Sequence, residues 1–349
     1  MRLEVLRAAD VSQAPSEWVG AVLCRDVLGE DGRPARLKGH RLERADALVL
    51  EASREEELHL LWLDPGDVDE DVAASRLAAA VAGEGVTVGR PVESQVRLSA
   101  AHRGLLRVDA TVLDAMNALG DVTVFALPDG IPIDAGRAIA GVKITPLAIP
   151  ETELAVAEER AAAGAHAGRV MTVRRFLPLT VTAVVCERLD ASARARFESS
   201  LRGKLAWFGG RAGDVLYAAG DPAATRDALL EAAVGSDIVL AVGVASTDPL
   251  DVTWRAALDA GAVEVRRGLP VHPGSSYWIA TLERRPVIGV ASCGMFSRRT
   301  ALDLLLTRLF AGEELDPRYL AGLGHGGLLA PQMAWRFPSY SETGAGAEE

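Results

Sequence analysis

The chain is poor in cysteine and has no long apolar run. Its three cysteines, Cys24, Cys186 and Cys293, lie far apart and form no Cys-x-x-Cys pair, which predicts a reducing compartment and no disulfide framework. The sequence also lacks the run of about twenty apolar residues that a transmembrane helix needs, and its N-terminus has no apolar signal core. These absences predict a soluble, cytoplasmic protein without a membrane partner.

Basic and aromatic residues are also scarce. The formal net charge is −11, and aromatic residues make up 5% of the chain. A nucleic-acid-binding protein needs a basic face for the phosphates, so this balance argues against a nucleic acid as partner. It does not argue against an anionic small molecule, because backbone N–H groups at a helix start bind phosphate without net positive charge. With so few aromatics, the core has to be built from Ala, Val and Leu.

A length of 349 residues fits two or three domains. Residues 1–150 are predicted to form an N-terminal β-rich α+β domain. Short apolar runs predict strands over Ala47–Leu50, Leu58–Leu63, Val86–Leu98, Val122–Leu127 and Arg137–Pro146. Helices are expected over Asp67–Gly83, with its early acidic residues, and over Thr111–Leu119.

The second half of the chain alternates apolar runs with helical patterns. Residues 151–176 are expected to connect the domains, beginning with an alanine- and glutamate-rich helix over Pro150–Ala167. Residues 177–328 then predict an α/β domain, with a parallel sheet covered on both faces. The strands expected are Leu179–Cys186, Asp214–Ala219, Asp237–Val242, Val263–Arg266 and Val287–Ala291, and the helices Ala191–Trp207, Pro222–Val234, Pro249–Ala260 and Arg298–Phe310. Residues 329–349 form a tail that is expected to be disordered from Pro338 onward.

The most informative stretch is Val242-Gly-Val-Ala-Ser-Thr-Asp-Pro-Leu-Asp-Val-Thr253, followed by Pro270-Val-His-Pro-Gly274. The first segment leaves a buried strand and enters a helix, which sets Asp248 and Asp251 at the carboxyl edge of the sheet. Open α/β sheets bind ligands at that edge. Read without gaps, the segment resembles the Thr-Gly-Gly-Met-Ser-Val-Asp-Pro-Asp-Asp signature of molybdopterin-binding domains of the MoeA/MogA type, which act in molybdenum cofactor biosynthesis.

Further residues of the α/β domain match this family. Glu187, Asp221 and Asp251 stand where the family has acidic residues after three successive strands, and Pro273-Gly274 matches its Pro-Gly element. Stand-alone bacterial and archaeal members appear similar over nearly the whole chain. That wider likeness rests on Lys38-Gly39-His40, Asp69-Glu70-Asp71, Asn117 and Gly324-His-Gly-Gly327. The family's Thr-Gly-Gly is here Val242-Gly243-Val244, which removes one hydroxyl and one glycine.

The resemblance implies a three-layer α/β/α domain that binds molybdopterin or its metal-loaded form. It implies a role in metal insertion or delivery, as a molybdenumtransferase-like transferase if the protein is an enzyme. The terminal phosphate is expected at Ser292–Arg299, which open the last helix and include Arg298 and Arg299. The pterin is expected near Gly243, Ser246, Asp248 and Asp251, between this loop, Val271–Ser275 and Ser292–Arg299.

The same resemblance implies a set of catalytic and metal-binding carboxylates. Glu187, Asp221 and Asp251 would hold Mg²⁺, which prefers carboxylate oxygens and would offset their repulsion of molybdate or tungstate. The protein would then act by positioning and metal-assisted electrostatics. A homo-oligomer and a recipient molybdoenzyme are the macromolecular partners that this role implies.

Structural interpretations of the same residues stay open. Asp248 before Pro249 is typical of a helix N-cap with proline at the first helical position. Asp251 would then only favour the helix dipole, and Glu187 and Asp221 would be solvated loop acids. A pterin-binding or chaperone module without chemistry fits the lost threonine and glycine. A nucleotide-binding α/β enzyme also fits the sheet, but no Gly-x-Gly-x-x-Gly follows any predicted strand.

Overall fold

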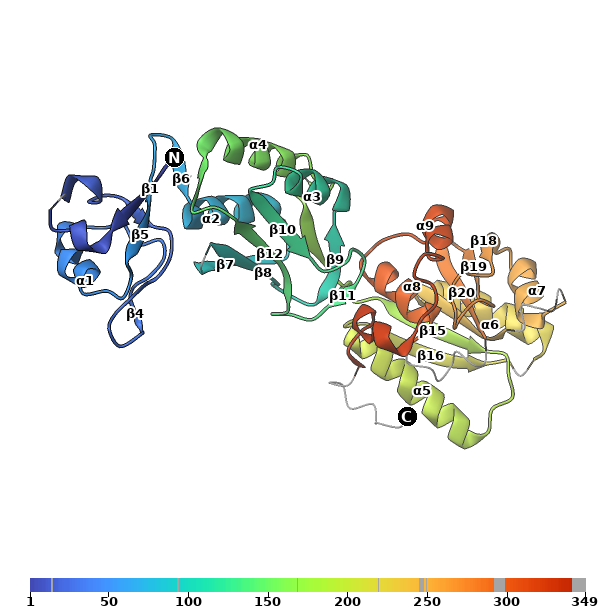
Figure 1. Ribbon diagram of the computed structural model, residues 1–349. Coiled ribbons are helices and arrows are strands. Elements are labelled where there is room, and N and C mark those ends of the chain that lie inside the picture. The colour runs from blue at the N-terminus through green and yellow to red at the C-terminus, as the bar shows by residue number, and fades with distance from the viewer. Residues whose placement is uncertain are drawn as a thin grey trace. The chain divides into compact units, whose positions relative to one another are not determined.

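The computed structural model describes residues 1–13, 15–92, 94–167, 169–218, 220–244, 248, 250–291 and 299–340. The chain divides into two compact units (Figure 1). Unit 1 comprises Met1–Ser99, Val108–Asp129 and Ala138–Thr172, and unit 2 comprises Ala100–Arg107, Gly130–Arg137 and Val173–Glu349. Among the described residues, no helix combines the length and the apolar composition needed to cross a membrane.

Unit 1 begins with a small β-rich lobe. A three-stranded sheet has the order β1-β5-β2, from β1 (Arg2–Arg7), β5 (Glu57–Trp62) and β2 (Val22–Leu23). A hairpin of β3 (Val27–Leu28) and β4 (Pro34–Arg36) adjoins it. Trp18 closes the core of the lobe, and its indole N–H donates to the Val11 carbonyl at 2.8 Å.

The expected strand over Ala47–Leu50 is wrong, because these residues form the helix α1 (Ala47–Glu51). A reciprocal pair of hydrogen bonds between Glu43 and Asp46 caps the turn that leads into it. Leu50 is fully buried whereas Leu48 is 78% exposed. The apolar run is short enough to fit either element, and the capping turn before it favours the helix.

The rest of unit 1 packs helices on an antiparallel sheet of order β10-β12-β8-β7. Its strands are β7 (Val86–Val92), β8 (Gln95–Ala100), β10 (Val122–Ala126) and β12 (Ala138–Ile144), with β6 (Asp67–Asp69) paired to β13 (Ala148–Pro150) beside them. The single strand expected over Val86–Leu98 is therefore two strands, with Ser94 at a positive φ of 63° between them. The helices are α2 (Glu70–Val81), α3 (Ala110–Asn117) and α4 (Glu151–Ala162).

Helix α4 packs within unit 1, although the sequence predicts a connecting helix at this place. Arg76 of α2 binds Glu151 and Glu158 on α4, at 2.6 Å and 2.9 Å. Leu154, Ala157 and Ala161 form the buried face of α4. These three residues are spaced so that they form one apolar stripe, which faces α2. Two of them are alanines, whose small side chains allow the helices to pack closely.

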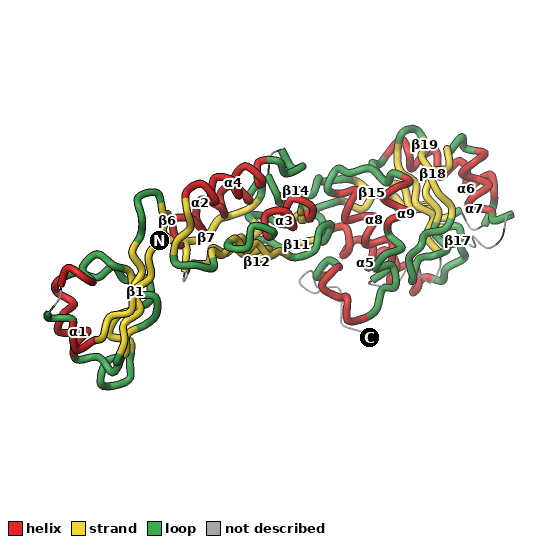
Figure 2. Tube along the Cα trace, turned by 45° about the horizontal axis from the view of Figure 1, so that its top comes forward, coloured by secondary structure: helices red, strands yellow, loops and turns green. Residues whose placement is uncertain are grey.

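Unit 2 contains a six-stranded sheet of order β16-β15-β17-β20-β19-β18. Figure 2 draws its strands in yellow. The bounds are β15 (Thr180–Val185), β16 (Arg211–Tyr217), β17 (Ile238–Val244), β18 (Val263–Arg267), β19 (Trp278–Leu282) and β20 (Arg285–Ala291). The pairs of β15 with β16 and β17, and of β17 with β20, are parallel. Strand β19 pairs antiparallel with both of its neighbours, β20 and β18. The expectation of a mainly parallel sheet is confirmed.

The strand β19 is absent from the sequence-based prediction. It forms a hairpin with β20 through Glu283 and Arg284, whose φ angles are 48° and 64°. Two-residue hairpins of this kind usually carry Asn-Gly or Asp-Gly, because glycine and asparagine tolerate positive φ. The Glu-Arg turn lacks that signal, so the sequence gives no sign of a hairpin there.

Helices cover the sheet in two groups: α5 (Ala191–Trp207) with α8 (Ala301–Phe310), and α6 (Pro222–Gly235) with α7 (Val252–Asp259). Val181, Ala183 and Val185 of β15 pack with the first group, and Val184 packs with the second. Alternate residues of one strand thus enter two separate cores. Smaller elements complete the described fold: β9 (Gly104–Val108), β11 (Pro132–Ile133), β14 (Met171–Arg175), α9 (Pro317–Gly322) and η5 (Pro331–Arg336).

The segment just after Pro338 was expected to be disordered, and its described part is instead packed into unit 2. Phe337 and Tyr340 are 5% and 9% exposed. The Tyr340 hydroxyl donates to Asp303 of α8 at 2.6 Å, and its ring lies 6.2 Å from that of Trp207. Tyr340, together with Phe337 just before this stretch, holds it on the domain. Residues 341–349 lie outside the described part.

Candidate functional site

The carboxyl ends of the four parallel strands β15, β16, β17 and β20 share one edge of the sheet in unit 2. Glu187 follows β15, Asp221 follows β16, and Asp248 and Asp251 follow β17. Parallel strands deliver the residues after them to a common crevice. The expectation that these carboxylates gather at one edge of one sheet therefore agrees with the observed topology.

Glu187 lies directly against Gly243. The Cys186 N–H donates to the Val242 carbonyl at 2.9 Å, which sets the two chain segments side by side. A Cβ atom on Gly243 would stand 2.6 Å from Cγ of Glu187, and the φ of this glycine is +102°. Only glycine meets both conditions without strain. Burial raises the pKa of the half-buried Glu187 carboxyl above its usual value.

Cys186 links Glu187 to the neighbouring carboxylate Asp251. The thiol is buried, which raises its pKa, while hydrogen bonds with Thr253 and Thr225 lower it. The negative charges of Asp251 and Glu187 raise the pKa of the thiol further. Such a thiol is protonated near neutral pH and is a poor nucleophile. The sequence-based argument did not single out Thr225 and Thr253, which stand four residues and two residues after the matched Asp221 and Asp251.

Two of the carboxylates cap helices. Asp221 accepts from the Ala224 N–H at 2.7 Å at the start of α6, and Asp251 accepts from the Trp254 N–H at 2.9 Å at the start of α7. Helix α7 therefore begins at Val252, and the expected start at Pro249 is wrong. Asp248 accepts from the Leu250 N–H at 2.8 Å in the turn before the helix, a local hydrogen bond typical of aspartate.

The described residues contain no group of three or more His, Cys, Asp or Glu side chains placed to hold a metal ion. Asp221 is exposed and Asp251 is 6% exposed, and each already has a backbone N–H as partner. The donor set that Mg²⁺ requires is therefore not assembled by Glu187, Asp221 and Asp251 in this structure.

The Pro273-Gly274 element lies against the start of α8. The Pro273 carbonyl accepts from the Ala301 N–H at 3.1 Å. A Cβ atom on Gly274, whose φ is +122°, would stand 2.4 Å from the Cβ of Ala301. On its other side, His272 exchanges backbone hydrogen bonds with Gly327 and Leu329, at 2.8 and 2.9 Å. The backbone at the end of the Gly324–Gly327 turn therefore holds this loop in place.

The start of α8 is already supplied with acceptors. The helix begins at Ala301, and the expected start at Arg298 is wrong. Thr300 and Asp303 cap each other, with the Thr300 N–H donating to Asp303 at 2.8 Å and the Leu302 N–H to Thr300 at 3.2 Å. A phosphate at these N–H groups would have to displace protein acceptors. Arg299 is exposed, whereas Ser246, Ser292 and Arg298 lie outside the described residues.

Val242 belongs to the core and does not face a ligand. It is 1% exposed and packs in the cluster that includes Phe197, Leu201 and Leu302. A threonine here, as in the family signature, would bury its hydroxyl among apolar side chains. We expect Val242→Thr to lower the free energy of unfolding by about 1–3 kcal/mol in denaturant titration. Val242→Ala, which leaves a cavity, is the control for lost volume, and a threonine variant more stable than wild type would contradict this account.

Comparisons with known proteins give structural neighbours alone. No family model and no curated protein matches the chain. Among solved structures, it is similar to the molybdopterin biosynthesis MoeA protein from Pyrococcus horikosii, with 16% identity, a TM-score of 0.29, and coverage of 71% of this chain and 76% of that one. It is also similar to a molybdenum cofactor biosynthesis protein from Pyrococcus furiosus, with 11% identity, a TM-score of 0.24, and coverage of 90% and 66%. Since both TM-scores lie below 0.5, the proposal below is built on this chain's own residues.

Proposed function

We propose that the carboxyl edge of the six-stranded sheet in unit 2 binds the pterin of molybdopterin or of its metal-loaded form. The observation that supports this most directly is Glu187 held against Gly243, with the charges of both Glu187 and Asp251 acting on the Cys186 thiol. A pterin presents adjacent N–H donors along one edge of its ring, and a carboxylate accepts two such donors side by side. The sequence signature around Gly243 and Pro273-Gly274 supports the same ligand.

The charges at this edge favour the pterin ring over the phosphate. Asp221 and Asp251 place negative charge at the starts of α6 and α7, and at the start of α8 the Thr300 N–H already donates to Asp303, whose charge is paired with Lys204. Carboxylates at these positions use the helix N–H groups and repel an anion. In this proposal the phosphate is therefore bound away from these three helix starts, and the donor-rich ring faces Glu187.

Between the roles consistent with such a site, binding or delivery of the cofactor is favoured over insertion of the metal. The specific observation is that the described residues assemble no metal-ligand group at this edge. Glu187, Asp221 and Asp251 then act on the organic part of the ligand. The protein would serve molybdenum cofactor biosynthesis as a carrier or a delivery factor for a molybdoenzyme, acting in a soluble compartment.

The test is the pterin content of the full-length protein, purified from a host that makes molybdopterin. Oxidation under denaturing conditions should release fluorescent pterin in a fixed ratio to protein. We expect Glu187→Gln and Asp251→Asn each to lower the retained pterin by about 10- to 100-fold, since a hydrogen bond to a charged group contributes about 1.5–3 kcal/mol. Asparagine caps a helix as well as aspartate does, so Asp251→Asn removes the charge and keeps the cap.

The matched control is Asp316→Asn, at the start of α9 in the same unit. Asp316 also caps a helix, accepting from the Arg318 and Tyr319 N–H groups at 2.8 and 2.9 Å, but it belongs to another part of the fold. Its substitution should leave pterin content unchanged. Wild-type protein that carries no pterin and takes up none when supplied with it would overturn the proposal. If only Asp316→Asn lowered the pterin content, the assignment of the site to this edge of the sheet would be wrong.

A further inference from the structure

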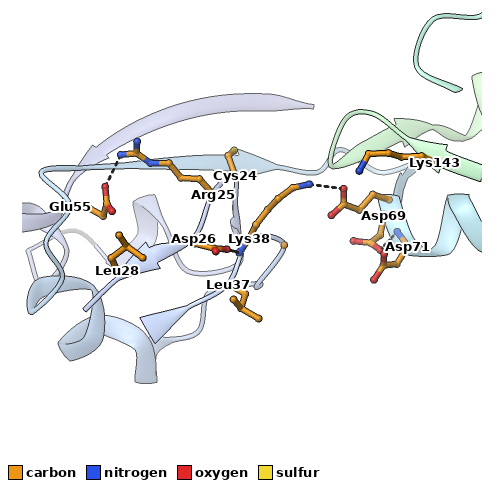
Figure 3. A pocket seen from close by; sticks show the side chains of 12 residues that line it. Cys24, Arg25, Asp26, Leu28, Leu37, Lys38, Glu55, Asp69, Asp71 and Lys143 are labelled. Carbon is orange, nitrogen blue, oxygen red and sulfur yellow. Dashed lines mark hydrogen bonds and ion pairs between the residues drawn. The ribbon is translucent and has the colours of Figure 1, made fainter. Parts of the chain in front are cut away.

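A cavity lies within unit 1, between the β-rich lobe and the start of α2. Its volume is about 720 Å³. One wall comes from the β-rich lobe, including Lys38, Leu28 and Leu37, and the other from the start of α2 and from Lys143 on β12 (Figure 3). This volume falls in the range of small-molecule sites, about 300–1,000 Å³.

A buried carboxylate, that of Glu70, lines this cavity. Glu70 is 7% exposed, and one of its oxygens accepts from the Lys38 ammonium at 3.2 Å across the cavity. Its other oxygen stands 3.7 Å from where a Cβ on Gly39 would lie. No hydrogen bond to that second oxygen is found among the described residues. A carboxylate removed from water in this way gains most from a second N–H donor.

The two members of the ion pair differ in exposure. The Lys38 side chain is 38% exposed and that of Glu70 is 9% exposed. An ion pair with one solvated member contributes little, typically about 0–1 kcal/mol. A ligand that carries both charges can enter between them and replace one weak pair by two. A ligand with a single charge leaves either Lys38 or Glu70 without a counter-charge.

Backbone groups engage the neighbouring acids. Asp69 accepts from the Asp71 N–H at 3.0 Å, and Asp71 accepts from the Ser94 N–H at 3.1 Å. At the far end, Arg25 and Glu55 neutralise each other at 3.0 Å. The lining also holds the acids Asp26, Asp69 and Asp71 and the base Lys143, so it favours an ammonium next to Glu70, while Lys38 is the cation paired with Glu70. Leu28 and Leu37 provide an apolar surface beside them.

We propose that this cavity binds a small zwitterion with an apolar body, its ammonium on Glu70 and its carboxylate on Lys38. Free amino acids and short peptides share this chemistry. The site is separate from the pterin site and does not rest on it. Because Glu70 is buried and Lys38 is half solvated, removing the ammonium from the ligand lowers its affinity more than removing the carboxylate does. The structure thus predicts a fixed order of affinities.

The experiment is titration calorimetry on the full-length protein with four probes of the same apolar body. These are L-leucine, its decarboxylated analogue 3-methylbutylamine, its deaminated analogue 4-methylpentanoate, and the dipeptide leucyl-leucine. We expect leucine or the dipeptide to bind at least 10-fold more tightly than the amine, and the acid to bind most weakly. Tighter binding of the dipeptide assigns a peptide as ligand, and tighter binding of leucine assigns a free amino acid. An amine that binds as tightly as both, or the absence of binding by all four probes, overturns the proposal.

Variants then assign the binding to this cavity. Lys38→Met should abolish the preference for leucine over the amine, because the amine then no longer leaves Lys38 without a counter-charge, whereas Lys38→Arg should retain that preference. Glu70→Gln should weaken both ligands. Arg202→Met, which removes an exposed charge on α5 in unit 2, is the control and should change neither. Leucine binding that is unchanged in Lys38→Met would show that the ligand lies elsewhere. The Lys38 variants decide this point even if Glu70→Gln does not fold.

Discussion

An Asp303→Asn variant is expected to lose about 3–5 kcal/mol of unfolding free energy, the effect typical of breaking one side of a buried ion pair. Asp303 is fully buried, and one of its oxygens lies 2.5 Å from the Lys204 ammonium on α5 and 2.6 Å from the Tyr340 hydroxyl. Its other oxygen accepts from the Thr300 N–H at 2.8 Å. The variant would leave the Lys204 charge, which is 7% exposed, without a counter-charge.

This loss should appear in unit 2 as faster hydrogen exchange of α5 and α8, together with a lower midpoint in urea. A loss of this size is a large part of the about 5–15 kcal/mol by which domains are usually stable. The exposed pair of Arg226 with Asp227 is the control, because Asp227→Asn there should change stability by less than about 1 kcal/mol. A double variant, Lys204→Met with Asp303→Leu, should be more stable than Asp303→Asn alone. An Asp303→Asn protein that exchanges like the wild type would contradict the assignment.

Tyr340 shows how this ion pair holds the C-terminal segment. Burial, and then the charge and hydrogen bond of Asp303, raise the pKa of the Tyr340 hydroxyl well above its ordinary value. The Lys204 ammonium lies 4.7 Å from the centre of the Tyr340 ring, as a cation over an aromatic face. The segment after η5 therefore closes the buried pair from solvent, which explains why residues up to Tyr340 pack on the domain.

Parts of this arrangement can be read from the sequence. Lys204 stands seven residues after Phe197 and three after Leu201, so helical spacing places it on the buried face of α5. Thr300 and Asp303 stand three apart, as the members of a capping box do, and they mark the true start of α8. That the two charges meet is not predictable, because the contact joins residues 99 positions apart through the packing of two helices.

The α/β alternation of unit 2 is predictable because its elements are long and strongly periodic. The helix over Ala191–Trp207 has the bounds expected from its sequence, and the parallel strands β15, β16, β17 and β20 overlap the expected apolar runs, although β16 and β20 begin earlier and β17 ends later. Unit 1 is less predictable, because its elements are short. A run of four residues such as Ala47–Leu50 fits a strand and a helix equally well, and the surrounding packing decides.

At the candidate site, sequence and structure answer different questions. The topology that gathers Glu187, Asp221 and Asp251 at one edge follows from their positions after parallel strands. Their hydrogen bonds do not follow, since an aspartate before a helix can cap it or face a ligand with the same sequence signal. The structure resolves this by giving Asp221 and Asp251 backbone partners, and it leaves Glu187 as the carboxylate set against Gly243.

A Gly243→Ala variant is therefore expected to have the largest effect on pterin binding. Alanine at a φ of +102° is strained, by about 1–3 kcal/mol, and its Cβ would stand 2.6 Å from Cγ of Glu187. Glu187 has to move, so retained pterin should fall at least about 10-fold, the ratio that about 1.4 kcal/mol produces. Gly235→Ala, at the end of α6 with no atom within 4 Å of its Cβ, is the matched control and should leave pterin content unchanged.

A double-variant cycle separates the displacement of Glu187 from strain in the backbone. In a Glu187→Ala background the alanine at position 243 no longer meets a long side chain, so the strain of the positive φ and a 3.3 Å contact with the backbone nitrogen of residue 187 remain. We expect Gly243→Ala to cost less unfolding free energy there than in the wild type, by at least about 0.5 kcal/mol, as coupled neighbours show. Pterin content in the double variant should not fall below that of Glu187→Ala, since the carboxylate proposed to accept from the pterin ring is already absent. Additive losses in both measurements would mean that Gly243 acts through its backbone, independently of Glu187.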